Sequence, residues 1–285
     1  MVVFPNAKIN LGLNIIRRRP DGYHDLETGF YPIAWKDVLE CSSLPASSVA
    51  TEPELIVTGQ SIQGLPQENI CLRAWQVLHN AFPSLPPVHL HLHKCLPMGA
   101  GLGGGSADGA FTLRLLCDKF FLSVSEDQLE DFTLELGSDC PFFLRNQPCF
   151  AEGRGERMRH LPLDLTAYSL LVVHPGIHVS TALAFEGVRP EIPKVPISEI
   201  LSQPVETWKG ALVNDFERSV FAQYPEIETL KARLYSLGAV YAAMSGSGSS
   251  VFGIFLSGQL PKPWASAPDN YIFFRQETMT PTIPK

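Results

Sequence analysis

The chain has 285 residues, of which 45% are hydrophobic and 18% are charged, and its formal net charge is −7. This balance is typical of a globular protein with one large or two medium domains. It argues against broad binding to nucleic acid or to an anionic membrane surface, because both require a basic surface. No apolar run reaches the roughly 18 residues of a membrane span, and we expect no signal or transit peptide. We therefore expect a cytoplasmic protein.

The first predicted element is a strand over residues 6–16, where apolar and polar residues alternate. Lys8 and Asn10 are expected to project from the same face of this strand. A turn over 17–23 follows, since Pro20-Asp21-Gly22 is a typical turn sequence.

A helix is predicted over 67–82 and a strand over 88–94. Three alternate histidines, His89, His91 and His93, share one face of that strand and could suggest a metal site. No acidic or cysteine ligand is placed beside them, so the polar side of a half-buried strand is the favoured interpretation. The six cysteines show no metal-ligand spacing and are expected to be reduced, mostly buried thiols.

The most informative segment is the glycine-rich stretch from Pro97 to Ala107, which has five glycines in seven residues. Glycine tolerates positive φ and lets a ligand approach the main chain closely, so successive N–H groups can surround an anion. A helix predicted to begin near Ser106 would add its unpaired N–H groups and its positive end. The segment is therefore predicted to hold phosphate groups, although a purely structural turn remains the alternative.

Other phosphate-binding motifs fit this segment less well. The spacing Gly99-x-Gly101-x-x-Gly104 satisfies the dinucleotide fingerprint, but the acidic residue expected about 20 positions later is missing. No Gly-Lys-Ser/Thr sequence follows, which argues against a P-loop. The His-Arg-Asp and Asp-Phe-Gly triplets of protein kinases are also absent from the sequence.

Beyond the turn, helices are predicted over 106–120 and from a capping box at Ser125 to Gly137. A buried strand is expected at 170–174, and an irregular segment with four prolines at 190–204. Another helix is predicted from Pro225 to Gly238. Two short strands, 239–243 and 251–255, are predicted to flank a second glycine-serine loop.

Three separated blocks resemble the galactokinase–homoserine kinase–mevalonate kinase–phosphomevalonate kinase (GHMP) superfamily. They are the strand bearing Lys8, the segment Pro97–Ala107 and the segment Met244–Gly248, in the order usual for that superfamily. Within it, the family of 4-diphosphocytidyl-2-C-methyl-D-erythritol kinases is the most similar, on three further segments, and the likeness extends over nearly the whole chain. These segments are 5–13 (PNAKINLGL), 18–28 (RRPDGYHDLET) and 137–143 (GSDCPFF).

The resemblance implies an α/β (α+β) fold with two domains. Residues 1–155 would form an ATP-binding domain like domain 2 of ribosomal protein S5, and residues 156–285 a ferredoxin-like domain. The activity implied is transfer of the γ-phosphoryl group of ATP to the 2-hydroxyl of the cytidine-diphosphate-linked methylerythritol, in non-mevalonate isoprenoid biosynthesis.

The resemblance also implies roles for particular residues. Asp139 would be the general base and Lys8 would keep it ionised, and the two are expected to meet at the phosphate-binding turn. A helix N-cap is the alternative for Asp139, and a solvated surface lysine is the alternative for Lys8. ATP would be contacted by Pro97, Met98, Gly99, Ala100, Gly101, Leu102, Gly103, Gly104, Gly105, Ser106 and Ala107, with Asn69, Lys94 and Met98 at the adenosine.

For the second substrate, Tyr23 and Phe185 would stack on the cytosine, and Asn10, His24 and Thr181 would contact the same molecule. Core packing is the alternative for Phe185, and a plain N-cap is the alternative for Ser106. ATP and Mg²⁺ are the expected cofactors, and the magnesium ligands are unassigned.

The sequence departs from the usual family pattern at Ala107, where a second serine is common. We expect Asp108 to favour the positive end of the helix rather than to bind a metal. Other functions remain open at this point. They are another GHMP small-molecule kinase (for homoserine, mevalonate or a sugar), a related diphosphate decarboxylase, and a nucleotide-binding protein without catalysis. The oligomeric state is not predicted.

Overall fold

The computed structural model describes residues 1–45, 49–62, 64–264 and 266–280. The chain divides into two compact units that are interleaved in the sequence. Unit 1 comprises Met1–Ala7, Trp35–Met98 and Gly103–Asn146, and unit 2 comprises Lys8–Ala34, Gly99–Leu102 and Gln147–Lys285. The predicted domain boundary at residue 155 stays a prediction.

Unit 1 contains a four-stranded sheet in the order β1-β4-β6-β5. The central pair, β4 and β6, is antiparallel, whereas β5 runs parallel to β6. The bounds are Val2–Val3 (β1), Val38–Ser43 (β4), Glu54–Gly59 (β5) and Val88–Lys94 (β6). Leu90 and Leu92 of β6 are fully buried, while the histidines that alternate with them are not. The strand predicted at 88–94 is therefore confirmed.

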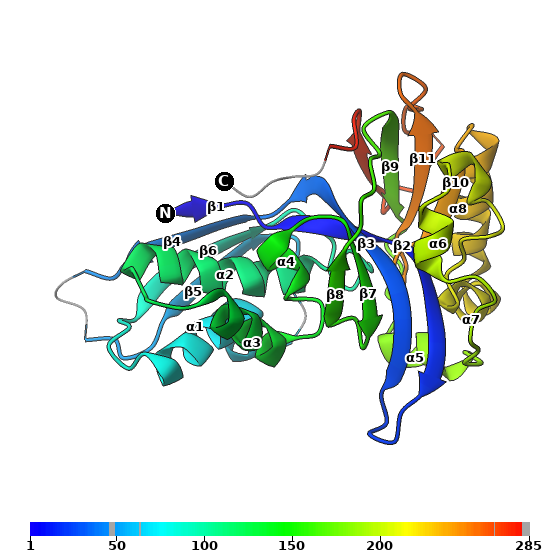
Figure 1. The fold of residues 1–285 in the computed structure, drawn as a ribbon. Helices are drawn as coiled ribbons and strands as arrows, with labels where there is room; N and C mark the ends of the chain where they lie inside the picture. Colours follow the sequence, from blue (N-terminus) through cyan, green and yellow to red (C-terminus); the bar gives the residue numbers. More distant parts are fainter. Residues whose placement is uncertain (46–48, 63, 265, 281–285) are drawn as a thin grey trace. The chain divides into compact units, whose positions relative to one another are not determined.

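Helices of unit 1 pack beside this sheet and against one another (Figure 1). They are α1 (Ile70–Ala81), α2 (Gly104–Phe120), α3 (Glu126–Leu136) and the short α4 (Phe142–Arg145), after the 3₁₀ turn η1 (Pro66–Glu68). Helix α1 begins three residues later than predicted because the Asn69 side chain caps it, accepting from Cys71 N at 2.9 Å. The capping box at Ser125 and the stop at Gly137 are confirmed.

Unit 2 contains two four-stranded sheets, in the described part of the chain. The first has the order β2-β3-β7-β8, and β2 and β3 form its two long strands (Figure 1). The bounds are Asn6–Arg18 (β2), His24–Lys36 (β3), Cys149–Gly153 (β7) and Arg157–His160 (β8). The strand predicted at 6–16 is confirmed, but both of its faces are buried from Asn6 to Ile15, so its polar side chains must find partners inside the protein.

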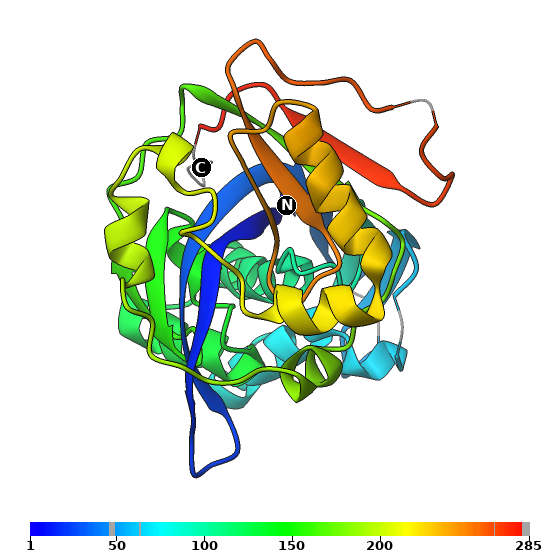
Figure 2. The same cartoon turned by 90° about the vertical axis from the view of Figure 1, so that its right-hand side faces the viewer.

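The second sheet has the order β10-β11-β9-β12, and all of its pairs are antiparallel. Its strands are β9 (Tyr168–His174), β10 (Tyr241–Met244), β11 (Val251–Leu256) and β12 (Ile272–Gln276). Helix α8 (Pro225–Ser236) packs on β10 and β11 (Figure 2), and α7 (Phe216–Gln223) precedes it. Leu13 and Ile15 of β2 belong to the same hydrophobic core, which joins the two sheets of this unit.

The proline-rich segment 190–204 is less irregular than predicted. It contains the short helix α6 (Ile197–Leu201), which begins directly after Pro196. The prediction was wrong there because proline is tolerated at the start of a helix, and residues 197–203 contain none. The remaining short elements are α5 (Thr181–Glu186) and η2 (Val205–Thr207).

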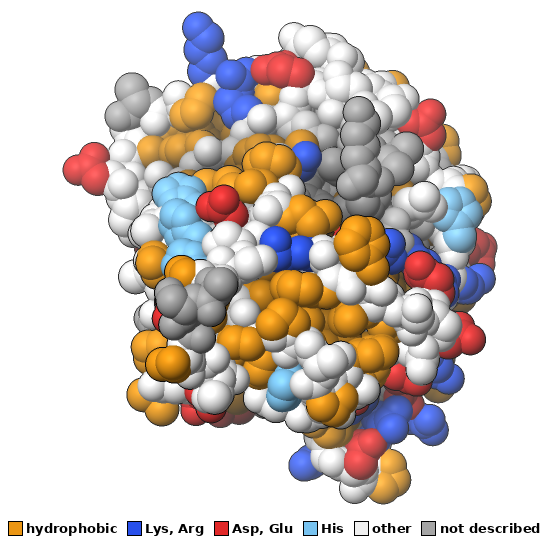
Figure 3. All heavy atoms as spheres, turned by 90° about the vertical axis from the view of Figure 1, so that its left-hand side faces the viewer, with side chains coloured by type: hydrophobic (Ala, Val, Ile, Leu, Met, Phe, Trp, Pro, Cys, Tyr) orange, Lys and Arg blue, Asp and Glu red, His pale blue; other side chains and the backbone are white. Residues whose placement is uncertain are grey.

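None of the helices in the described ranges is long and apolar enough to cross a lipid bilayer. All six cysteines are free thiols, and five of them are buried. Figure 3 shows a short row of histidine side chains on the face that it displays. In unit 1, Thr58 Oγ1 lies 2.9 Å from both His91 Nε2 and His93 Nδ1. Among the described residues, no group of three or more His, Cys, Asp or Glu side chains could hold a metal ion.

Candidate active site

The predicted phosphate-binding turn has the positive backbone φ angles that its glycines led us to expect. Gly99, Gly101 and Gly103 adopt φ values of 63°, 75° and 71°, which only glycine adopts readily. The intervening Ala100 and Leu102 are buried and anchor the turn. Gly101 has a second reason to be glycine, because a Cβ there would lie 1.9 Å from the carbonyl oxygen of Ser245.

Helix α2 begins directly after the turn, at Gly104, two residues earlier than predicted. Gly103 is the N-cap residue and offers no side chain, so Ser106 is not the N-cap. The N–H groups of Gly104, Gly105 and Ser106 belong to the first turn and have no carbonyl partner within the helix. These three amides and the positive end of a 17-residue helix suit a phosphate group.

Lys8 lies in unit 2 and is only 4% exposed, so it is not a solvated surface lysine. Its ammonium group donates a hydrogen bond to Asn10 Oδ1 at 2.5 Å and lies 4.8 Å from the ring centroid of Phe30. Asn10 in turn donates from Nδ2 to Thr28 Oγ1 at 3.0 Å. The position of the lysine side chain is thus fixed by a buried amide.

Ser245 connects β2, the strand that carries Lys8 and Asn10, to the phosphate-binding turn within unit 2. Its Oγ accepts a hydrogen bond from Asn10 N at 3.1 Å and donates one to the carbonyl oxygen of Gly101 at 2.7 Å. The second glycine-serine loop is itself held by Asn214, whose Nδ2 donates to the carbonyl oxygens of Met244 and Gly246 at 2.8 Å each. Sequence reasoning noted this loop but did not identify Ser245 as a site residue.

Asp139 lies in unit 1, half-buried, in the short connection between α3 and α4. The N-cap position of α4 is Pro141, so the capping alternative for Asp139 is wrong. Burial raises the pKa of the neighbouring Cys140 thiol to about 12, against the effect of a hydrogen bond with the Ser106 side chain. That bond places the first turn of α2 beside the Asp139 segment. The meeting of Asp139 with Lys8 stays a prediction, since the two residues belong to different units.

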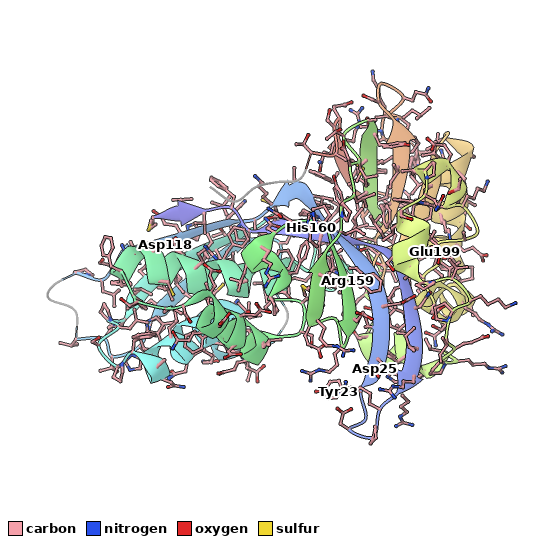
Figure 4. All side chains as sticks on the ribbon, viewed as in Figure 1. Tyr23, Asp25, Asp118, Arg159, His160 and Glu199 are labelled. Carbon is pink, nitrogen blue, oxygen red and sulfur yellow. The ribbon has the colours of Figure 1, made fainter. Side chains whose placement is uncertain are left out.

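The residues predicted to hold the cytosine lie in unit 2. Phe185 stacks on His24, with ring centroids 4.6 Å apart and an interplanar angle of 18°. Burial and the nearby Arg18 lower the pKa of His24, which favours the neutral ring in this stack. Tyr23 is 56% exposed near the end of the β2–β3 hairpin (Figure 4), with the Arg154 guanidinium 4.9 Å from its ring centroid. Tyr23 therefore faces Arg154 here, and His24 is the ring that meets Phe185.

One further predicted contact, Thr181, and one residue that was not predicted, His178, lie beside the glycine-rich segments of unit 2. Thr181, the first residue of α5, lies 3.4 Å from Ser247 through the two hydroxyl oxygens, which links α5 to the second glycine-serine loop. His178, which sequence reasoning missed, lies against Gly99, where a Cβ would be 2.8 Å from its Nδ1.

The residues predicted to contact the adenosine lie in unit 1 and differ in their exposure and in their hydrogen-bond partners. Met98 is 37% exposed, and Asn69 uses its Oδ1 to cap α1. Lys94 is fully buried and pairs with Asp37 and Asp108. The Asp108 carboxylate thus pairs with a buried lysine, a partner that sequence reasoning did not identify.

Unit 2 also contains a cavity of about 820 Å³. Its lining includes Asn14, Arg189, Asp215 and Arg218, and none of the predicted site residues.

Comparisons with known proteins identify the family of this chain. Residues 69–147 match the N-terminal domain of the GHMP kinases, and residues 199–263 match their C-terminal domain. A 4-diphosphocytidyl-2-C-methyl-D-erythritol kinase of Cytophaga hutchinsonii is 51% identical over 256 residues, which are 90% of this chain and 92% of that protein. The enzyme of the same name from Bacteroides thetaiotaomicron is 50% identical over 263 residues, covering 92% and 95% of the two chains. The chain belongs to the 4-diphosphocytidyl-2-C-methyl-D-erythritol kinase family.

Solved structures support the same membership. A crystal structure of a 4-(cytidine 5'-diphospho)-2C-methyl-D-erythritol kinase is 34% identical, with a TM-score of 0.74 and 90% coverage of both chains. A homoserine kinase from Cytophaga hutchinsonii shares only 15% identity at a TM-score of 0.65, which reflects the common fold. The predicted α/β GHMP kinase fold is therefore confirmed, and the two matched segments lie on either side of residue 155.

Proposed function

We propose that this member of the 4-diphosphocytidyl-2-C-methyl-D-erythritol kinase family transfers the γ-phosphoryl group of ATP to the 2-hydroxyl of 4-diphosphocytidyl-2-C-methyl-D-erythritol. The reaction belongs to non-mevalonate isoprenoid biosynthesis. One observation supports the chemistry most strongly: Asn10 fixes Lys8, and through Ser245 the same residue is tied to Gly101 of the phosphate-binding turn. A buried cation and a phosphate cradle thus belong to one hydrogen-bond network. Phosphoryl transfer depends chiefly on such positioning and on charge stabilisation.

Asp139 is the proposed general base. As the substrate hydroxyl oxygen attacks the γ-phosphorus, its proton passes to the Asp139 carboxylate, and the bond from the γ-phosphorus to the β–γ bridging oxygen breaks to release ADP. Lys8 would stabilise the negative charge that develops on the attacking oxygen and on the phosphoryl group. The convergence of Lys8 and Asp139 is part of this proposal.

GHMP kinases use ATP as the phosphoryl donor, and the N–H groups at the start of α2 suit its phosphates. We propose Mg²⁺ as the companion ion. The ion would enter as its ATP complex, since Mg²⁺ is usually bound through substrate phosphates and keeps several waters. When bound, it neutralises charge on the transferred phosphoryl group.

For the cytidylyl substrate, we propose stacking of the base on Phe185 and Tyr23, with His24, Asn10 and Thr181 as polar contacts. The aromatic faces of these residues suit a flat base. The position of His24 against Phe185 implies that the base would enter beside or in place of this ring pair. The free cysteines fit a reducing compartment, and we propose the cytoplasm.

The test is incubation of the purified protein with Mg-ATP and the cytidylyl substrate, followed by mass spectrometry of the product. We expect a gain of one phosphoryl group on the cytidylyl compound. Homoserine and mevalonate serve as controls, and phosphorylation of either instead would assign the chain to another GHMP activity. Binding of ATP without any product would favour a non-catalytic nucleotide-binding protein.

A further inference from the structure

Lys94 is the last residue of β6, and its side chain has no solvent exposure. The ammonium group donates hydrogen bonds to two carboxylates, Asp37 and Asp108, the latter at 2.7 Å. Asp37 is equally buried, and the Asp108 side chain is 3% exposed. A lysine enclosed in this way is a structural element of unit 1, and its ammonium is not presented to solvent.

Each carboxylate reaches a different end of the phosphate-binding turn. Asp37 Oδ1 accepts the backbone N–H groups of Cys95 and Leu96 at 2.6 and 2.8 Å, which fixes the chain where it enters the turn. Asp108 lies in the second turn of α2, the helix by which the chain leaves it. Lys94 therefore joins the entry and the exit of the turn, and all of these residues belong to unit 1.

The ammonium group also lies close to the first residue of α2. A Cβ on Gly104 would be 3.5 Å from Lys94 Nζ. The N–H groups of this first turn are those that suit a phosphate. A cation and two carboxylates thus lie directly behind the proposed phosphate site, where any change in their charge is felt with little solvent screening.

The charges in this cluster do not balance when every group is ionised. Burial raises the pKa of Asp108 to about 7, against the opposing attraction of Lys94, and Asp108 Oδ1 has no hydrogen-bond partner among the described residues. Burial alone would lower the pKa of Lys94, but Asp108 and Asp37 raise it, so the lysine stays charged. The neighbouring thiols of Cys71 and Cys95 have raised pKa values because of burial and stay neutral.

We propose that Lys94 is a positioning residue, which fixes both ends of the phosphate-binding turn by pairing with Asp37 and Asp108 at once. The inference rests on the proposed binding of ATP phosphates at the start of α2. It replaces the predicted adenosine contact of Lys94. Since bound phosphates bring negative charge close to Asp108, nucleotide binding should also be accompanied by proton uptake at that carboxyl group.

The first test is calorimetric titration of a non-hydrolysable ATP analogue near pH 7, in two buffers of different ionisation enthalpy. The wild type is expected to take up protons on binding, and Asp108→Asn is expected to bind the analogue without proton uptake. Uptake that persists in Asp108→Asn would overturn the role of Asp108. Absence of binding by the wild type would contradict the proposed ATP site instead, so the two failures are distinguishable.

The second test is steady-state kinetics of Lys94→Met, which removes the hydrogen bonds to Asp37 and to Asp108. We expect the KM for ATP to rise at least tenfold with a smaller fall in kcat, because the two ends of the phosphate-binding turn are no longer held in place. Lys209→Met is the control for a lost lysine, since Lys209 is exposed in unit 2 and its Nζ lies 4.5 Å from the ring centroid of Tyr235, and it should leave the KM for ATP unchanged. An unchanged KM in Lys94→Met would overturn the proposal. If that variant does not fold, Asp108→Ala, which removes only the contact at the exit of the turn, is measured in its place, and an unchanged KM for ATP there would overturn the proposal.

Discussion

The hydroxyl of Ser245 donates a hydrogen bond to the carbonyl oxygen of Gly101 at 2.7 Å, although 144 residues separate them in the sequence. Because Ser245 Oγ also accepts from Asn10 N, one buried hydroxyl joins the second glycine-serine loop, the phosphate-binding turn and the strand that carries Lys8. Loss of this hydroxyl should therefore affect phosphate binding and the lysine together.

Ser245→Ala leaves the N–H of Asn10 without its partner in a buried environment, which costs roughly 1–3 kcal/mol of stability. We expect a raised KM for ATP together with a lower kcat, measured by steady-state kinetics alongside denaturant unfolding. The exposed Ser257→Ala serves as the control for a lost serine hydroxyl. Wild-type kinetics in Ser245→Ala would refute this connecting role.

Gly101→Ala is expected to be more damaging than the loss of the hydroxyl. The alanine Cβ would lie 1.9 Å from the Ser245 carbonyl oxygen, and the positive φ alone costs roughly 1–2 kcal/mol. Gly258→Ala isolates the φ cost, because Gly258 has a φ of 79° with open space around it. Urea denaturation should give a loss for Gly101→Ala that exceeds the loss for Gly258→Ala by about 1 kcal/mol or more. Equal losses would mean that the turn relaxes freely.

Lys8→Ala and Asp139→Asn test the proposed chemical step. Each should lower kcat by ~10²-fold or more while ATP still binds, because general-base and electrostatic stabilisation act in the transition state. If the two residues act as a couple, the double variant should lose little more than the worse single variant. Near-normal turnover in either single variant would remove that residue from the mechanism, and fully additive losses would argue that the two act independently.

The elements that were predicted well are those that depend on local chemistry. Three glycines of the phosphate-binding turn have positive φ, which other residues do not adopt readily, so this turn could be recognised from the sequence. The capping box at Ser125 satisfies helix-end donors with residues three positions apart, so it could also be recognised from the sequence. Pro225 begins α8 for the same kind of reason.

The partners of buried polar groups could not be predicted in this way. The role of Lys94 depends on Asp37, which is 57 residues away, and nothing in the local sequence pairs them. The stacking of Phe185 on His24 likewise joins α5 to β3, which are distant in the chain. The start of α2 was misplaced because Ser106 is a good N-cap by propensity, but the left-handed Gly103 ends the turn first.

Phe185→Leu tests the proposed binding of the base. Leucine keeps an apolar side chain against Phe216, which Phe185 contacts edge-on at 4.8 Å between ring centroids, but it removes the aromatic face. Base–aromatic stacking is worth roughly 1–3 kcal/mol, so the KM for the cytidylyl substrate should rise about tenfold or more. The KM for ATP should not change, and it serves as the internal control. A parallel rise of both KM values would point to a packing defect instead.

His174 should make the protein sensitive to acid. Burial lowers its pKa to about 4, and its Nδ1 lies 3.4 Å from the hydroxyls of Ser249 and Ser250. The unfolded state binds a proton near pH 6.5, whereas the folded state does so only near pH 4, so stability is lost as pH falls through this window. The loss should reach up to ~3 kcal/mol by pH 4.

The measurement is the free energy of unfolding between pH 4 and 7.5 for the wild type and for His174→Gln. The glutamine variant lacks the titrating ring, so its stability should fall less steeply over this range, even if it is less stable at neutral pH. His160, which is exposed on β8, provides the matched control, and His160→Gln should follow the wild-type curve. Parallel curves for His174→Gln and the wild type would assign the acid sensitivity to other groups.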